Sequence, residues 1–368
     1  MITRDATRNE SWAVFGQFSW RPDILSRKLE IVPGIRYTRD TREVRVVDNG
    51  SVSYALGASS YTQVSNPVLQ SGNGQLEGSK TTPGLSVLYH FDDQMMGYGK
   101  IARGYRTGGF NMADSNLARA LTGFAPETLT SKELGFKGQF LESRLRTNLA
   151  YFVMDYKDQQ MQLSVPSSTG GYSAIIANAG NSQIKGFELD AVYAVTKNLR
   201  LGLSWTRLDL TYKKVVAPGT STNVASRFRR TLPKNNYTVN VDYRFPDLGL
   251  PGKLEGHLDY THMDAQSGST TDGITQGGVF AGYTTTGFAE LDLTPAYSVW
   301  NGRLALNGIS AGPNGLGDVS VGLWAKNLTD KKYLSYVMAG SPFGGITGAA
   351  LGVWAPRRTV GVDVIYRF

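Results

Sequence analysis

The sequence contains no cysteine, and it lacks any long run of apolar residues. The absence of cysteine excludes a disulfide framework and thiolate-bound metals, and it fits an oxidising compartment. No segment reaches the roughly 18 apolar residues that a membrane-spanning helix needs. The start of the chain, from Met1 to Asp5, also lacks the basic and apolar stretches of a secretory signal. A helical membrane protein is therefore excluded.

Histidine is scarce, and basic residues are not clustered. The three histidines, His90, His257 and His262, lack metal-ligand spacing, and the last two should face opposite sides of one strand, so we predict no metal site or cofactor. The net charge is +8, but the basic residues are spread along the whole chain. Nucleic-acid binding usually needs a concentrated basic face, which makes it a poor fit. Lipopolysaccharide phosphates or an anionic ligand fit the charge better.

Glycine and aromatic residues are abundant, with 43 Gly, 19 Tyr, 15 Phe and 6 Trp. This composition suits strands and turns better than helices. Residues 236–245 alternate strictly: one face would carry Tyr237, Val239, Val241, Tyr243 and Phe245, and the other face only polar residues. The last ten residues alternate in the same way. A period of two residues predicts strands with one apolar face.

The alternating segments are long, and this favours a membrane barrel over a soluble sandwich. Strands of soluble sandwiches average five to six residues, whereas barrel strands need about 9 to 11 to cross the bilayer. In residues 254–261 the other face would carry Glu255, His257, Asp259 and Thr261, as expected of a polar lumen. Because lipid cannot satisfy an open sheet edge, the strands must close into a barrel.

We predict thirteen strands, over residues 11–20, 28–40, 79–91, 95–105, 131–141, 143–156, 182–195, 199–212, 235–245, 253–264, 283–297, 316–328 and 357–368. Short connections alternate with long ones, the long ones being about 41–78, 106–130, 157–181, 213–234, 265–282 and 329–356. The connection at residues 298–316 belongs to the short, periplasmic connections by its place in the order, but it is unusually long for one. Short periplasmic turns and long extracellular loops are typical of outer-membrane barrels. Bacterial barrels have even strand numbers, so an odd count means either that one strand is miscounted or that strands are missing from the front.

Five sequence blocks carry a resemblance to a known family. They are YGKIARGYRTGGFN at 98–111, PET and ELGFK within 126–137, NAG and IKGFEL within 178–189, AKNLTDKKY at 325–333, and PRRT at 356–359 leading to the final Tyr366-Arg367-Phe368. In this order and spacing, from about residue 11 to 368, the chain resembles the barrel of TonB-dependent receptors. The resemblance implies an all-β, antiparallel transmembrane barrel of 22 strands, of which these are about the last thirteen.

The resemblance also implies partners. Such receptors take up a scarce nutrient, most often a ferric siderophore, and couple to the TonB complex through an N-terminal region. We expect that region and the plug domain to be missing from residues 1–368, so that the chain is a fragment. Outer-membrane lipid, lipopolysaccharide and the outer-membrane assembly machinery are further expected partners, with Tyr366 and Phe368 as the assembly signal.

Ligand recognition in such receptors is expected from arginine and aromatic side chains on the extracellular loops. By loop position the candidates are Arg106, Phe110, Tyr172, Tyr336 and Trp354. Aromatic residues in barrels also form girdles at the lipid interface, so each could have that role instead. Glu255 and Asp259 could be taken as paired catalytic carboxylates, but lumen lining is the simpler interpretation, and we predict no enzyme. The alternatives are a plugless porin or an outer-membrane enzyme barrel, or a structural or adhesive barrel.

Overall fold

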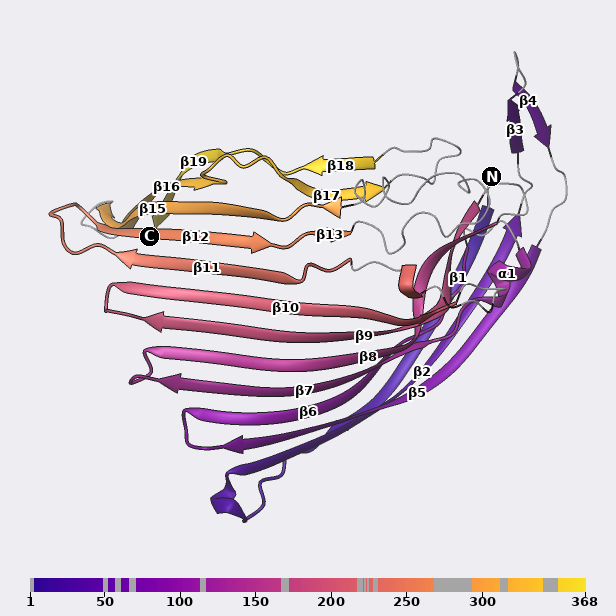
Figure 1. Ribbon diagram of the computed structural model, residues 1–368, viewed down its shortest axis with the longest axis horizontal. Helices are drawn as coiled ribbons and strands as arrows, with labels where there is room; N and C mark the ends of the chain where they lie inside the picture. Colours follow the sequence, from indigo (N-terminus) through magenta and orange to yellow (C-terminus); the bar gives the residue numbers. More distant parts are fainter. Residues whose placement is uncertain are drawn as a thin grey trace.

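Thirteen strands form one antiparallel sheet in chain order (Figure 1). The computed structural model describes residues 3–48, 52–56, 61–65, 71–112, 117–166, 172–216, 221, 223, 225–227, 231–267, 293–311, 317–339 and 350–368. The strands of the sheet are β1 (Thr3–Gln17), β2 (Leu29–Asp48), β5 (Ser71–His90), β6 (Met95–Arg106), β7 (Glu127–Phe140), β8 (Leu145–Pro166), β9 (Tyr172–Ala194), β10 (Leu199–Val215), β11 (Asn235–Arg244), β12 (Lys253–Met263), β15 (Tyr297–Ala311), β16 (Gly317–Lys326) and β19 (Thr359–Arg367). The predicted fold class and the number of strands are confirmed.

Short turns gather at one end of the sheet and long connections at the other (Figure 1). The long connections contain their own small elements: the hairpins β3 (Val52–Leu56) with β4 (Tyr61–Ser65) and β17 (Leu334–Ala339) with β18 (Ala350–Trp354), the short pair β13 (Gln266–Ser267) with β14 (Leu293–Thr294), helix α1 (Leu117–Thr122) and the 3-10 turn η2 (Ala225–Arg227). A second 3-10 turn, η1 (Leu25–Arg27), lies between β1 and β2. The predicted alternation of short and long connections is confirmed.

The predicted bounds of the eleventh strand are wrong. Of its predicted range, 283–297, residues 283–292 lie outside the described residues, and the strand that completes the sheet is Tyr297–Ala311. The predicted long turn at 298–316 is therefore mostly strand. Its alternation is weak because Gly302 interrupts the apolar face while Val299 and Ala305 lie on the other face. Two predicted loops are also partly strand, because β2, β5, β8 and β9 extend into 41–78 and 157–181.

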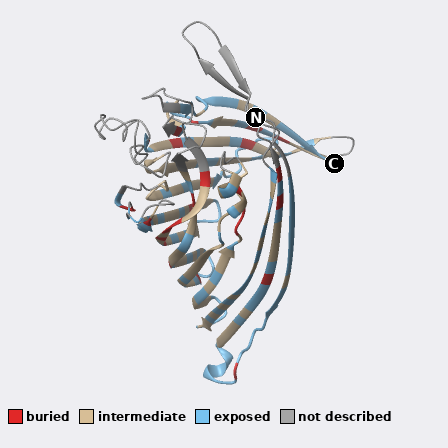
Figure 2. Ribbon diagram, turned by 90° about the vertical axis from the view of Figure 1, so that its right-hand side faces the viewer, coloured by how far each residue is buried: buried red, intermediate tan, exposed pale blue. Residues whose placement is uncertain are grey.

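The two faces of the sheet differ as a barrel wall requires. Leu134, Val362 and Val364 are 65–67% exposed on one face, which we call the outward face. Directly paired residues share a face, so the register also places Leu85, Leu201, Val239, Leu304 and Leu323 there. The other face, the inward face, is largely polar. Buried residues are few and scattered along the strands (Figure 2). Apolar residues thus face outward, which is the arrangement of a protein surrounded by lipid.

Aromatic rings form two rows on the outward face. Toward the long connections, ring pairs join Trp12 to Tyr37, Phe187 to Trp205, Tyr237 to Tyr260, and Tyr260 to Trp300. Toward the short turns, they join Tyr89 to Phe91, Phe136 to Phe140, Tyr243 to Phe245, and Tyr366 to Phe368. Two aromatic rows with an apolar band between them correspond to the two interfaces of a bilayer.

On the inward face, three aromatic side chains each cover a glycine on the neighbouring strand. The pairs are Tyr98 with Gly135, Phe152 with Gly186, and Trp324 with Gly361, each directly opposite in the register. A Cβ atom at any of these glycines would come within 2.4 Å of the covering ring. Gly135 and Gly186 belong to the ELGFK and KGFE blocks. These blocks therefore contain glycine because a ring needs the space.

The sheet is curved, and the part of it that the structure describes is open (Figure 1). Its edge strands are β1 and β19, which pair among the described residues with β2 and β16 respectively. Among the described residues, no helix has the length and apolar character to span a membrane. The thirteen strands thus form a curved wall with one apolar and one polar face.

Candidate ligand-binding site

The connection between β6 and β7 folds against β9 and is fixed there by two asparagines. Asn111 is buried; its Nδ2 donates to the Ile176 carbonyl at 2.8 Å, and its Oδ1 accepts from the Ile176 N–H at 2.7 Å. Asn178 donates from Nδ2 to the carbonyls of Ala125 and Asp158, and it accepts from the Ala125 N–H at 2.7 Å. Both ends of this connection are thereby bonded to the extended part of β8 and β9.

The same connection packs on β5. Helix α1 places Leu121 against Gly72, and the ring of Phe110 lies against Gly74. A Cβ atom at Gly72 would come within 2.3 Å of Leu121, and one at Gly74 within 2.8 Å of Phe110. Glycine at both positions therefore lets the connection approach the strand. Phe110 thus packs against β5 and is half-buried.

A second fixed structure lies between β16 and β19, in the NLTDKKY block. Asn327 is buried and accepts from the Lys331 N–H at 2.8 Å, while its Nδ2 donates to the carbonyls of Lys331 and Pro356. Its own N–H donates to Oδ1 of Asn301 on β15 at 2.9 Å. Asn327 and Asp330 have φ angles of 52° and 53°, in the left-handed region that Asn and Asp tolerate best among residues with a side chain.

Asp330 joins this turn to the segment before β19. Its carboxylate accepts from Nε of Arg357 at 2.8 Å, from a second guanidinium nitrogen of Arg357, and from the Arg358 N–H at 2.9 Å. The hydrogen bonds from Arg357, followed by the one from the Arg358 backbone, hold the pKa of Asp330 well below its ordinary value. The carboxylate is thus charged throughout the neutral range and clamps the two segments together.

The structure places the five predicted ligand residues at three connections, those between β6 and β7, between β8 and β9, and between β16 and β19. Arg106 ends β6 and is exposed, and Phe110 follows in the same connection. Tyr172 begins β9, but its side chain lies outside the described residues. Tyr336 and Trp354 belong to one hairpin, β17–β18, and are 44% and 65% exposed. Apart from Arg106 and Tyr172, which lie at strand ends, these residues belong to the connections, away from the two aromatic rows.

Nearer the short turns, polar side chains on the inward face form hydrogen bonds and ion pairs with one another. Glu255 accepts from Arg244 at 2.9 Å and from Asn307 at 3.0 Å, and Asp259 accepts from Asn301 at 2.7 Å. His257 lies 2.7 Å from Asp242, and Arg303 donates to Asp363 at 2.7 Å. Glu255 and Asp259 therefore each have separate partners, as lumen lining would. His262 points outward to Ser298, so the prediction that His257 and His262 face opposite sides is confirmed.

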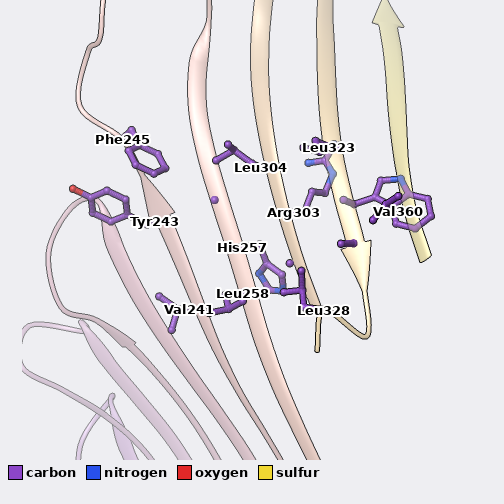
Figure 3. Close-up of a pocket in the computed structure, with 14 residues that line it drawn as sticks. Val241, Tyr243, Phe245, His257, Leu258, Arg303, Leu304, Leu323, Leu328 and Val360 are labelled. Carbon is purple, nitrogen blue, oxygen red and sulfur yellow. The ribbon is translucent and has the colours of Figure 1, made fainter. Parts of the chain in front are cut away.

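Among the described residues, two hollows lie on the half of the sheet nearer the short turns. The one drawn in Figure 3 is lined mainly by apolar outward residues, including Val241, Leu258, Leu304, Leu323 and Val360. Since that face contacts lipid, this hollow is suited to acyl chains and is a poor site for a polar nutrient. The other is lined by polar and charged groups of β10 to β12 near the short turns, among them Lys197, Arg200, Asp242 and Arg244. Neither hollow includes a predicted ligand residue.

The asparagines that fix the connections were not predicted as site residues. The sequence places Asn111, Asn178 and Asn327 within the motif blocks without indicating their role. The only indication in the sequence is that each asparagine lies in a motif block whose other residues form strands or tight turns. Their role as clamps depends on partner carbonyls that lie up to 65 residues away.

Comparison with known proteins agrees with this geometry. A sequence model of the TonB-dependent receptor-like β-barrel matches residues 2–328. The ferric yersiniabactin uptake receptor FyuA from Yersinia pestis is 16% identical, with a TM-score of 0.71 over 100% of this chain and 47% of that one. The ferric-catecholate import receptor Fiu from K12 E. coli is 17% identical, with a TM-score of 0.63 over 99% and 45%. The copper transporter OprC is 16% identical, with a TM-score of 0.63 over 97% and 49%.

At these identities the solved structures show the fold alone, and this chain spans under half the length of each. The family match covers most of the chain, and the sheet has the outward apolar band, inward polar face and asymmetric connections that such barrels need. The chain belongs to the TonB-dependent receptor family, whose members are receptors and transporters rather than enzymes, and it lies in the outer membrane of a Gram-negative bacterium as part of that family's β-barrel.

Proposed function

We propose that this chain is the C-terminal portion of a receptor barrel that imports a ferric siderophore, with energy from the TonB complex. The observation that carries the proposal is the connection after β6, which Asn111 and Asn178 hold in a fixed position at the extracellular end. A fixed connection can present a preformed recognition surface, because little ordering remains to oppose binding. The similarity to FyuA, a ferric yersiniabactin uptake receptor, and to Fiu, a ferric-catecholate import receptor, supports iron as the cargo.

The exposed side chains at this end suit an anionic, ring-bearing chelate. Arg106 offers a guanidinium, and Tyr336 and Trp354 offer exposed rings. Tyr172 stays a candidate by position. Phe110 supports the connection, and we propose that it acts on binding through packing. We further propose that TonB contacts a segment that precedes Met1 in the complete receptor, and that the assembly machinery reads Tyr366 and Phe368.

An uptake assay with the complete receptor tests this proposal. The reading frame, with its native upstream sequence, is expressed in iron-starved cells that lack their own siderophore receptors, and accumulation of radiolabelled iron is followed with a panel of ferric siderophores. We expect uptake of at least one siderophore, and we expect deletion of TonB to abolish it. Uptake that persists without TonB, or an iron-starved strain that gains no iron from any siderophore, would contradict the proposal.

A paired substitution tests the proposed binding residues. Arg106→Ala removes a charged hydrogen-bond donor, so it should weaken siderophore binding about tenfold or more. Arg45→Ala, at an exposed outward position on β2, is the matched control and should leave binding unchanged. Equal binding by the two variants would remove Arg106 from the site.

A further inference from the structure

A serine, a histidine and an aspartate contact one another on the outward face, beside the aromatic row nearer the long connections. His262 on β12 is directly opposite Ser298 on β15, and Asp264 follows the end of β12. Nδ1 of His262 lies 2.8 Å from Oγ of Ser298, and Nε2 lies 3.1 Å from Oδ1 of Asp264. Among the described residues, the hydrogen-bond partners of the other two histidines are carboxylates only. His262 therefore differs from them in joining a hydroxyl to a carboxylate.

The hydrogen bonds fix the position of each proton. The Asp264 carboxylate can only accept, so Nε2 of the neutral imidazole carries the ring proton and Nδ1 is the acceptor. Ser298 therefore donates its hydroxyl proton to Nδ1, while its oxygen accepts from the Tyr260 hydroxyl at 2.9 Å. A serine whose proton is shared with a base is an activated nucleophile. Serine proteases use the two ring nitrogens in the opposite order, but the acceptor nitrogen of a neutral imidazole can be either one.

Two neighbours hold the aspartate and the histidine in place. Asn235 donates to Oδ2 of Asp264 from its backbone N–H at 2.9 Å and from Nδ2 at 2.7 Å, which leaves Oδ1 for the histidine. The Tyr237 ring stacks on the imidazole, with the ring centroids 5.0 Å apart. The base and its aspartate thus have a fixed orientation before any substrate binds, as the arrangement of nucleophile, base and orienting group requires.

The three side chains are accessible from the lipid side. Those of His262 and Asp264 are 22% and 30% exposed, and Ser298 is half-buried. Toward the short turns on the same face lies the apolar hollow of Figure 3. Leu258, which lines it, is four residues from His262, or about 14 Å along the strand. An ester at Ser298 would thus lie beside the aromatic row, with its acyl chain directed toward the hollow.

We propose that Ser298, His262 and Asp264 form a hydrolase site for acyl esters whose chains lie along the outward face. Oγ of Ser298 attacks the ester carbonyl carbon as His262 takes its proton; the bond to the alcohol oxygen then breaks, and His262 returns the proton to that oxygen. Water attacks the acyl-serine in the same way, which releases a fatty acid and restores Ser298. Asp264 is a positioning residue for the base. The Tyr260 hydroxyl, next to Oγ of Ser298, donates to the oxyanion.

This activity is separate from import, because the site lies on the opposite face from the lumen. Ser298 and His262 are 36 residues apart and no motif surrounds either one, so the sequence alone predicts no enzyme here. Tyr260 is the one oxyanion donor that we assign. Since each such donor contributes about 10²–10³-fold in rate, we expect slow hydrolysis compared with enzymes that have two.

Covalent labelling of the complete receptor tests the proposal. Protein extracted from outer membranes in a neutral detergent is treated with a long-chain alkyl fluorophosphonate, which reacts with activated serines, and the labelled residue is identified by peptide mass spectrometry. We expect the label on Ser298. No label, or a label spread over other serines, would overturn the proposal. This result needs no variant that must fold.

Hydrolysis then identifies the source of the ester. Fatty acid release is measured in mixed micelles that contain phosphatidylethanolamine or lipid A as the only lipid. We expect release from at least one of them, and the faster of the two rates shows which lipid is the substrate. No release from either lipid would contradict the proposed activity.

Matched variants locate the activity, with heat-modifiable mobility as the check that each one assembles. Ser298→Ala should abolish labelling and hydrolysis, and His262→Asn should slow both about 100-fold or more, because a general base contributes at least that much. His257→Asn, on the inward face, is the matched control and should behave as the parent chain does. Asp264→Asn should slow the labelling of Ser298 and Asp264→Glu should restore part of the rate, which a purely structural aspartate would not show. Equal rates for the two histidine variants would overturn the proposal.

Discussion

Three asparagine side chains act as clamps at the extracellular end. Asn111 and Asn178 attach the connection after β6 to β8 and β9, and Asn327 ties the turn after β16 to the segment before β19. An asparagine amide donates and accepts at once, so it can replace a backbone pairing where no strand continues. The motif blocks of this chain thus contain residues that hold the loops as well as residues that form the wall.

Replacing Asn327 by alanine should destabilise the barrel. The change leaves the Lys331 N–H and the Lys331 and Pro356 carbonyls without this partner, and unsatisfied buried groups cost about 1–3 kcal/mol. Urea unfolding in detergent, followed by heat-modifiable mobility, measures the loss. Asn73→Ala, at an exposed position on β5, should unfold as the parent chain does. Equal midpoints for the two variants would show that Asn327 is not a clamp.

The Asp330 clamp should weaken in acid. Because the pKa of Asp330 is depressed in the folded chain, its ion pair stabilises above the unfolded value of about 3.9, and the stabilisation is lost as pH falls from there toward the folded pKa. The difference in unfolding midpoint between the parent and Asp330→Asn should therefore stay constant from about pH 7 to about pH 5 and shrink below about pH 4. Arg357→Gln should reproduce the neutral-pH effect. A difference that does not change with pH would argue against the ion pair.

At the scale of the strand, the alternation of apolar and polar residues predicted most of the strands, but it did not predict how far they extend beyond the membrane. Strand 235–244 could be placed from its apolar period alone, because lipid on one side and water on the other impose that period. In the extracellular part of β2 the apolar residues Val44 and Val46 are buried on the inward face, near the connection after β6, while Glu43 and Arg45 are exposed on the outward face. The apolar outward period of the membrane wall therefore stops there, although the pairing of β2 with β5 and of β8 with β9 continues. Strand Tyr297–Ala311 was missed because Gly302 and Ala305 blur the contrast between its faces.

Adding a methyl group at Gly186 should destabilise the sheet. Its Cβ would come within 2.1 Å of the Phe152 ring, which must then move from its place on the inward face. Overpacking of this kind costs about 1–3 kcal/mol. Gly99→Ala is the matched control, since a Cβ there meets nothing within 4 Å. Urea midpoints of the two alanine variants measure the effect, and equal midpoints would show that the ring does not need the glycine.

Removing the last three residues, Tyr366 to Phe368, should abolish assembly into the outer membrane. This deletion shortens the edge strand β19, which pairs with β16 through Tyr366 and Arg367, and it removes the predicted terminal aromatic signal. The readout is the heat-modifiable band in outer-membrane fractions. Phe368→Tyr keeps an aromatic terminus and should assemble. Normal assembly of the truncated chain would contradict this role.

At the scale of the whole molecule, the sheet is a wall with lipid on one side and a lumen on the other. Its asymmetry appears twice: between the apolar outward face and the polar inward face, and between the short and the long connections at its two ends. Both could be predicted from the sequence because each is a pattern along the chain.

The most direct test of the barrel wall uses the natural absence of cysteine. Leu203 and Ser204 are consecutive on β10, Leu203 on the outward face and Ser204 on the inward face. Single cysteines at these positions are spin-labelled in outer membranes, and contact with oxygen in lipid is compared with contact with a water-soluble nickel complex. We predict that the label at 203 senses lipid and the label at 204 senses water. The same environment at both positions, or the reverse, would contradict a wall with lipid on its outward face.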